Sequence, residues 1–276
     1  MEHHHVTRTP IFRRAIHWLI AMAVALLLIL WFAADASAEN GQPARPTVVL
    51  VHGAFADSSS WNGVVSRLLA HGYPAIAVAV PLRGVKSDAA YVSDVLRSIK
   101  GPVVLVGHSY GGMVITEAAV GNKHIKSLVY VAAFAPEKGE SAAKLSGRFP
   151  GSTLAPTLAP PVSVPGGKDL LIRQDKFWKQ FAADLPEKKA RLMAVAQRPV
   201  TEAGLNDPAD ASAWKTIPSW FVYGELDKNI PPAAHAFMAK RAKAKESVEV
   251  KGASHVVMIS RPGMVARLIR DAAGER

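Results

Sequence analysis

Short runs of β-branched and aliphatic residues alternate with longer, amphipathic segments along most of this chain. The short runs contain few polar residues, as is typical of strands that are buried on both faces of a parallel sheet. They predict strands at 47–52, 75–80, 103–108, 125–133, 219–224 and 247–250. The segments between them repeat apolar residues at helical spacing. They predict helices at 60–71, 88–100, 110–120, 232–244 and 262–273. The alternation predicts an α/β fold, a mostly parallel central sheet with helices on both faces.

The alternation stops between Ala135 and about Trp214. We expect residues 136–214 to form a cap that closes over the functional site and excludes water. The first half of this insertion is rich in proline and glycine, so we expect it to be irregular. The second half has helical apolar spacing. Its apolar residues are Phe177, Trp178, Phe181, Leu185, Leu192, Met193 and Val195.

The N-terminal residues follow a different pattern. Three arginines precede an apolar run from about Trp18 to Ala34, and Ala36-Ser37-Ala38 then gives the small-x-small pattern of a signal peptidase site. Residues 1–38 are therefore predicted to be an export signal cleaved after Ala38, which would place the protein in the periplasm or outside the cell. The alternative is an uncleaved membrane anchor at residues 15–34, because the run is close to the shortest membrane span.

The remaining chain is predicted to hold one main domain. Residues 39–46, with their glycine and prolines, form a linker, and residues 47–276 form the α/β domain with its insertion. There is no cysteine, which excludes disulfides, thiolate catalysis and cysteine metal sites. The net charge of +11 suits anionic substrates or surfaces, but solvated surface charge explains it as well. No nucleic-acid motif accompanies it, so nucleic acid is not an expected partner.

The third predicted strand leads into the most informative motif. The apolar run from Val103 ends in Gly107-His108-Ser109-Tyr110-Gly111, and a helical segment follows. Gly-x-Ser-x-Gly between a strand and a helix is the nucleophile elbow. Its tight turn strains the backbone of the nucleophile, and the two glycines leave room where a Cβ would clash. The motif predicts Ser109 as a nucleophile at a helix N-terminus, which favours developing negative charge.

A serine hydroxyl needs a base, an orienting acid and an oxyanion hole. On this motif the partners follow in the order serine, acid, histidine. Strand 219–224 is followed by Glu225-Leu226-Asp227, and the last predicted strand by Gly252-Ala253-Ser254-His255. We predict Asp227 as the acid and His255 as the base. Glu225 and Asp207 remain alternative acids.

Two backbone N–H groups are predicted to form the oxyanion hole. One belongs to Tyr110, the residue after the nucleophile, and the other to the loop after the first strand, with Ala54 as first choice and Phe55 as second. The predicted substrate-binding side chains are Phe55, His108, Phe177, Trp178 and Phe181. Five other histidines are expected to be structural or solvent-facing, with His108 packed beneath the nucleophile. These are His52, His71, His108, His124 and His235.

With these residues in place, the chain resembles the α/β-hydrolase superfamily from about residue 46 onward. It is most similar to the branch of plant methyl esterases, the salicylate-binding esterase and hydroxynitrile lyases, with their bacterial esterase relatives. The resemblance implies the α/β-hydrolase fold with a cap, and catalysis without a cofactor or metal. The motifs that carry it are Leu50-Val51-His52-Gly53-Ala54 with Trp61, Gly107-His108-Ser109-Tyr110-Gly111-Gly112, and Ser254-His255-Val256-Val257-Met258-Ile259-Ser260.

Two positions depart from the lyases of that branch. The lyases carry threonine where this chain has Gly53, and lysine directly after the catalytic histidine, where it has Val256. Without that lysine no obvious cation stabilises departing cyanide. We therefore expect a serine hydrolase that cleaves a small to medium, apolar carboxylic ester through a Ser109 acyl-enzyme. The alternatives are a lyase or other proton-transfer reaction on the same residues, with Lys228 as the substitute cation, and a ligand-binding protein with a slow triad.

Overall fold

The computed structural model describes residues 45–275. The predicted export signal, the alternative anchor and residues 39–44 of the predicted linker lie outside the described residues. Within the described part, no helix combines the length and the apolarity needed to cross a membrane.

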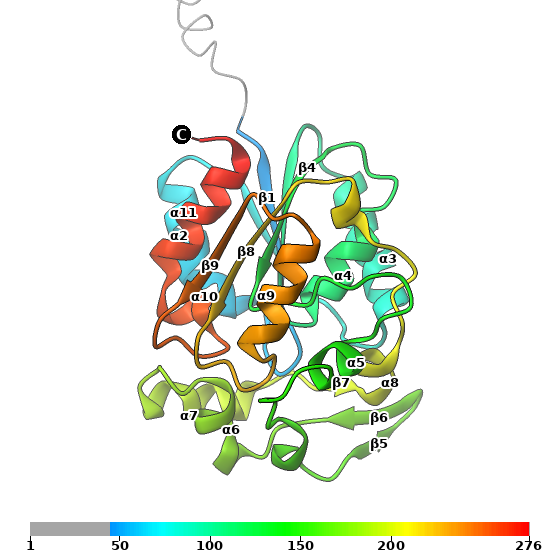
Figure 1. The fold of residues 1–276 in the computed structure, drawn as a ribbon, viewed down its shortest axis with the longest axis vertical. Helices are drawn as coiled ribbons and strands as arrows, with labels where there is room; N and C mark the ends of the chain where they lie inside the picture. The colour runs from blue at the N-terminus through cyan, green and yellow to red at the C-terminus, as the bar shows by residue number, and fades with distance from the viewer. Residues whose placement is uncertain (1–44, 276) are drawn as a thin grey trace, which may run out of the picture. The chain divides into compact units, whose positions relative to one another are not determined.

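A six-stranded parallel sheet forms the centre of the fold (Figure 1). The strands lie in the order β2-β1-β3-β4-β8-β9, and every neighbouring pair is parallel. Their bounds are β1 Thr47–Val51, β2 Ala75–Val78, β3 Val103–His108, β4 Ile125–Val131, β8 Ser219–Gly224 and β9 Glu246–Val250. The sequence prediction of the strands is confirmed to within two residues at every end. All six residues of β3 are buried, which explains its continuous apolar run.

The chain enters the sheet at β1, which lies between β2 and β3. The connection from β1 to β2 and the connection from β2 to β3 therefore run toward opposite edges of the sheet. Between β1 and β3 this reversal opens a crevice at the carboxyl ends of the strands, where ligands bind in α/β folds. The two segments predicted to hold the nucleophile and the oxyanion donors, after His108 and after Val51, both begin at this crevice.

Helices cover both faces of the sheet, as predicted. Figure 1 shows α2 and α11 together on one side, and α3, α4 and α9 on the other. The bounds are η1 Ser58–Trp61, α2 Asn62–Ala70, α3 Val85–Arg97, α4 Gly111–Ala118, α9 Pro232–Arg241, α10 Val257–Ser260 and α11 Pro262–Ala273. Burial of one face drives the packing of α11: Val265, Leu268 and Ile269 are completely buried, while its charged residues face outward.

Between β4 and β8 the chain forms a series of short elements, most of which Figure 1 shows together at one end of the sheet. They are α5 Ala142–Gly147, η2 Ala155–Thr157, β5 Val162–Val164, β6 Gly167–Leu170, α6 Gln174–Phe181, α7 Glu187–Ala196, β7 Val200–Thr201, α8 Glu202–Asn206 and η3 Ala213–Lys215. The helical second half was predicted, but the expectation of an irregular first half was wrong.

That first half contains a β-hairpin. β5 and β6 pair antiparallel across the two-residue turn Pro165-Gly166, and β7 adds a third strand. Proline fixes a suitable φ, and Gly166 takes the positive φ of +88° that the turn needs. Strands of three and four residues are too short to show a recognisable alternation, so the sequence signalled the turn but not its strands.

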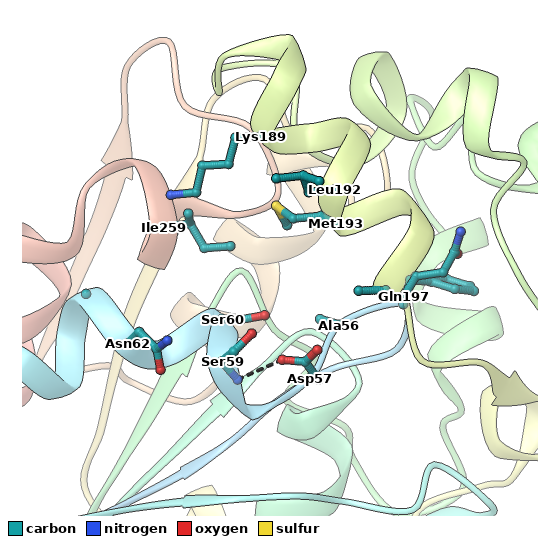
Figure 2. A pocket seen from close by; sticks show the side chains of 13 residues that line it. Ala56, Asp57, Ser59, Ser60, Asn62, Lys189, Leu192, Met193, Gln197 and Ile259 are labelled. Carbon is teal, nitrogen blue, oxygen red and sulfur yellow. Dashed lines mark hydrogen bonds between the residues drawn. The ribbon is translucent and has the colours of Figure 1, made fainter.

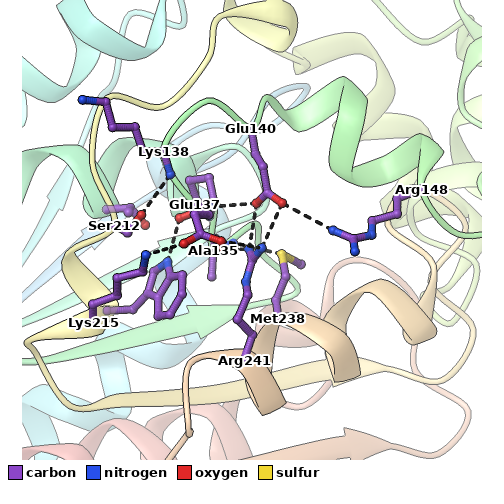
Figure 3. A network of polar contacts seen from close by, with 12 residues as sticks. Ala135, Glu137, Lys138, Glu140, Arg148, Ser212, Lys215, Met238 and Arg241 are labelled. Carbon is purple, nitrogen blue, oxygen red and sulfur yellow. Dashed lines mark hydrogen bonds and ion pairs between the residues drawn. The ribbon is translucent and has the colours of Figure 1, made fainter.

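A polar network joins the start of this insertion, its end and α9 (Figure 3). The Arg241 guanidinium donates to both carboxylate oxygens of Glu140, at 2.8 and 2.7 Å, and to the carbonyl of Ala135 at 2.9 Å. It also stacks over the ring of Trp214, 5.2 Å away. Lys215 pairs with Glu137 beside it. The planar guanidinium binds both oxygens of Glu140 and stacks on Trp214, so it restricts the orientation as well as the position of both segments. The network therefore anchors both ends of the insertion to α9.

Candidate active site

The predicted nucleophile lies in a strained turn between β3 and α4. Ser109 has a φ of +53°, in the left-handed region that side-chain-bearing residues rarely adopt. Hydrogen bonds hold it there: its N–H donates to the Val131 carbonyl at 3.3 Å, and its carbonyl accepts from the N–H groups of Gly112 and Phe134 at 2.9 and 3.2 Å. The backbone strain that the motif predicted is confirmed.

The glycines of the motif are required by close backbone contacts. A Cβ on Gly107 would lie 2.6 Å from the Gly111 carbonyl oxygen, and one on Gly111 would lie 2.5 Å from the oxygen of Val51. Real Cβ atoms do not approach backbone oxygens so closely, so side chains at these positions would force α4 away from β1 and β3. The spacing in Gly-x-Ser-x-Gly therefore reflects the packing of α4 on the sheet.

Asp227 and His255 form a buried hydrogen-bonded pair. Asp227 Oδ2 accepts from His255 Nδ1 at 2.7 Å, and Oδ1 accepts from the N–H groups of Asn229 and Ile230 at 2.8 and 3.0 Å. Burial by itself raises the pKa of Asp227, but the charge of His255 and the hydrogen bonds from His235 and His255 outweigh it, and the pKa lies below the ordinary value. The carboxylate is ionised and holds a proton on His255 Nδ1.

His255 Nε2 is consequently the ring nitrogen that carries a free electron pair. This atom is buried and has no hydrogen-bond partner among residues 45–275. The Ser109 hydroxyl makes no hydrogen bond to it in this structure; such contacts commonly tighten only when substrate binds. His108 connects the two segments, since its Nε2–H donates to the His255 carbonyl at 3.2 Å and its ring centroid lies 4.8 Å from that of His255. Burial lowers the pKa of His108 well below its ordinary value, so it is neutral.

The two alternative acids lie elsewhere. Glu225 is exposed, and its Oε2 accepts from the Gly252 N–H at 2.9 Å. Asp207 lies at the end of α8, next to Gly84. Of the three carboxylates considered from the sequence, Asp227 alone contacts His255.

The loop after β1 brings a second backbone N–H toward Ser109. His52 Nδ1–H donates to the Gly53 carbonyl at 3.0 Å, and His52 Nε2 accepts from the Val80 N–H at 3.0 Å. Because the Gly53–Ala54 peptide is trans, holding its carbonyl fixes the Ala54 N–H in the opposite direction. His52 thus orients the predicted donor, and burial, which lowers its pKa, keeps it neutral.

The three candidate oxyanion donors differ in availability. Within the described chain, the N–H groups of Ala54 and Tyr110 have no acceptor, and both residues line the same cavity as Ser109. The N–H of Phe55 donates to the Arg198 carbonyl at 3.0 Å. Phe55, the second choice from the sequence, is therefore already occupied.

The cavity at Ser109 has a volume of about 350 Å³ and a mostly apolar lining. None of the five side chains predicted to bind substrate lines it. Phe177 and Phe181 are completely buried and pack on one another, with ring centroids 4.9 Å apart. Trp178 is held by a hydrogen bond from its indole N–H to the Leu185 carbonyl. The lining comes instead from the elbow, α5 and the segments after them: Ala54, Ser109, Tyr110, Phe134, Ala142, Ala143, Ser146, Gly147, Ser152, Leu154, Ala155, Leu158, Leu205, Asn229 and Ile230.

A second cavity, of about 380 Å³, lies on the other side of the loop after β1 (Figure 2). Asp57, Ser59 and Ser60 form one wall, and Lys189 and Leu192 of α7 face them. Phe55 lines this second cavity, whereas its neighbour Ala54 lines the first. The second cavity is slightly larger, but it lacks Ser109, so the smaller one is the candidate substrate site.

Two buried residues near the site make contacts that the sequence did not predict. His235, one of the histidines expected to be structural or solvent-facing, is buried and contacts Asp227. Asp88, from α3, accepts from the Tyr110 hydroxyl at 2.9 Å and from the Arg83 N–H at 3.3 Å. A lone histidine or aspartate within a helix carries no local signal of such a contact.

Asp88 leads to a prediction about stability and pH. Burial raises the pKa of its carboxyl, against the opposing hydrogen bond from Tyr110. The unfolded chain therefore releases this proton at a lower pH than the folded protein, and folding stability falls as pH rises between the two pKa values. Asparagine stays neutral, so we expect Asp88→Asn to gain stability relative to the wild type between about pH 4 and about pH 7. Urea unfolding at both pH values measures this difference, and a difference independent of pH would contradict it.

The fold and the site define a class: a parallel α/β sheet with a serine at a nucleophile elbow and a buried aspartate–histidine pair in the loops after later strands. Residues 48–268 match the model of the alpha/beta hydrolase family, and the chain belongs to that family.

Individual relatives agree with this assignment. The chain is 30% identical to the alpha/beta hydrolase nvfD of Aspergillus novofumigatus, over 84% of this chain and 98% of that protein. It is 26% identical to the pimeloyl-[acyl-carrier protein] methyl ester esterase of Aeromonas salmonicida, over 83% and 96%. It is 23% identical to the alpha-hydroxynitrile lyase of Arabidopsis thaliana, over 78% and 92%. Polyneuridine aldehyde esterase has the same fold, with a TM-score of 0.72 at 20% identity, over 82% and 98%. The predicted resemblance to the esterase and lyase branch is confirmed.

Proposed function

We propose that this α/β hydrolase is a carboxylic ester hydrolase that works through an acyl-enzyme on Ser109. His255 Nε2 takes the Ser109 proton as the hydroxyl attacks the ester carbonyl, and returns a proton to the leaving alcohol. Asp227 holds the imidazole in the required tautomer and stabilises its protonated form. The N–H groups of Ala54 and Tyr110 stabilise the oxyanion. Water then attacks the acyl-enzyme by the same steps.

One observation carries this proposal. The buried Asp227–His255 pair leaves Nε2 with a free electron pair, and the His255 ring packs on His108, the residue before the serine in the strained turn. An ionised carboxylate bound to one imidazole nitrogen makes the other nitrogen more basic, so this pair supports proton abstraction by Nε2. The relatives named as esterases support ester hydrolysis as the reaction.

The cavity supports an apolar, uncharged substrate of small to medium size. No Asp, Glu, Lys, Arg or His side chain is among the residues that line it. A charged acyl or alcohol group would lose its hydration there without gaining a partner, which costs several kcal/mol or more. The small side chains of Ala142 and Ala143 leave room for the acyl or alcohol group.

Lyase chemistry on the same residues would need a cation near the leaving cyanide. Val256 takes the position of the lysine of the lyases and is completely buried. Lys228, the substitute considered from the sequence, is exposed. The site therefore favours hydrolysis over cyanide release.

We expect measurable hydrolysis of short p-nitrophenyl esters, covalent labelling of Ser109 by an organophosphonate, and no cyanide release from mandelonitrile above the Ser109→Ala background. A series of graded acyl chain lengths measures the size of the pocket. Strong, Ser109-dependent cyanide release with inert esters would favour the lyase instead. Labelling without turnover of any ester would favour a ligand-binding protein with a slow triad.

A further inference from the structure

A second histidine shares the carboxylate of the proposed acid. His235, in the first turn of α9, places Nε2 3.2 Å from Asp227 Oδ2, the same oxygen that accepts from His255 Nδ1 at 2.7 Å. All three side chains are almost completely buried. The His235 ring stacks on Tyr223 of β8, with ring centroids 4.8 Å apart and planes 17° from parallel. Its position is therefore fixed by packing as well as by the hydrogen bond.

The hydrogen bonds determine which nitrogen of His235 carries the proton. Asp227 is an ionised acceptor, so His235 Nε2 must be the donor. His235 Nδ1 is buried and has no hydrogen-bond partner in the described part of the chain. A second proton there would be a buried donor without an acceptor. His235 therefore acts as a neutral Nε2–H donor.

The Asp227 carboxylate consequently receives four donors. Two backbone N–H groups bind Oδ1, and two imidazoles bind Oδ2. A carboxylate has about four acceptor positions, so this one cannot rotate without breaking a bond. Each additional donor on Oδ2 also withdraws negative charge from the bond to His255.

We propose that His235 is a positioning residue for the hydrolysis proposed above, on which this inference rests. It holds Asp227 Oδ2 in the direction of His255 Nδ1 and weakens the attraction between that oxygen and a protonated His255. The titratable groups that the structure places against it are Asp227 in the loop after β8, His255 in the loop after β9 through the shared oxygen, and Tyr223 on β8.

Two variants separate this role from a merely structural one. His235→Phe keeps a flat ring on Tyr223 but has no donor, whereas His235→Gln offers an amide N–H at about the distance of Nε2. For His235→Phe we expect kcat on p-nitrophenyl butyrate to fall about tenfold with KM unchanged, because Asp227 can rotate. The midpoint of the acidic limb of the pH–rate profile should move to higher pH by roughly half a unit. Without the His235 donor, Asp227 Oδ2 carries more negative charge and favours the protonated form of His255. His235→Gln should restore both values most of the way.

The bond itself gives a readout that does not depend on turnover. The His255 Nδ1–H proton, observed by NMR in histidine-labelled protein, should shift in His235→Phe and return toward the wild-type position in His235→Gln. Absence of ester turnover in the wild type would overturn the proposed hydrolysis, and this NMR comparison would still test the role of His235. An unchanged resonance overturns that role. An unchanged pH profile in an active wild-type background also overturns it, as does equal loss of kcat in both variants.

Discussion

Ser109→Ala and His255→Ala are each expected to lower ester turnover by about 10⁴-fold or more, while thermal unfolding changes little. The losses are similar because each variant removes one part of a single unit: alanine at 109 leaves nothing to attack the carbonyl, and alanine at 255 leaves the hydroxyl without a base. Some activity should remain in each variant, because the oxyanion hole and substrate binding still accelerate the reaction without the triad. Initial rates on p-nitrophenyl butyrate and melting temperatures are the measurements.

Asp227→Asn should be severe but somewhat milder. Oδ1 faces two backbone N–H groups and Oδ2 faces two imidazole N–H groups, so either orientation of an amide points its NH₂ group at donors. When the NH₂ group faces His255, the imidazole must change tautomer, which places a proton on the nitrogen that has to accept one; when it faces the backbone N–H groups, the loop after β8 must move. Glu225→Gln and Asp207→Asn are the matched controls and should keep their activity. Near wild-type activity in Asp227→Asn, with loss in either control, would show that the acid is assigned to the wrong residue.

Gly53→Ala is expected to lower kcat by about 10²-fold, the usual effect of losing one oxyanion donor. The added Cβ would lie 2.6 Å from Ser109 Cβ and 2.8 Å from the His108 carbonyl oxygen. The loop after β1 must move outward to relieve this contact, and it carries the Ala54 N–H with it. The position matters for comparison with the lyases, whose threonine there would make the same contact with this backbone.

Gly263→Ala is a suitable control for this prediction. Gly263 is an exposed residue in α11, and an added Cβ would meet only Arg67 Nε at an ordinary 3.5 Å. We expect full activity and unchanged or slightly higher stability, since alanine favours helix more than glycine does. Full activity in Gly53→Ala as well would argue against the Ala54 N–H as a donor.

The parts of the fold with long local patterns were predictable from the sequence. The strands of the central sheet are four to seven residues long and mostly apolar, and the longer helices repeat apolar residues at helical spacing, so their positions follow from periodicity. The β5–β6 hairpin was missed because its strands are too short to show a period. Pro165-Gly166 predicts a turn, but a turn by itself does not indicate whether strands precede and follow it.

The sequence by itself determined the parallel sheet, the strained turn at Ser109, and Asp227 and His255 as candidates in loops after successive strands, because chain order and local spacing encode them. Only the tertiary structure decided what lies around those residues. In the folded protein the Phe55 N–H donates to the Arg198 carbonyl, and residues of α5 line the cavity at Ser109 in place of Phe177. His235, on α9, lies against Asp227. Such contacts depend on how helices and loops pack across the ends of the strands, and no local period records that packing.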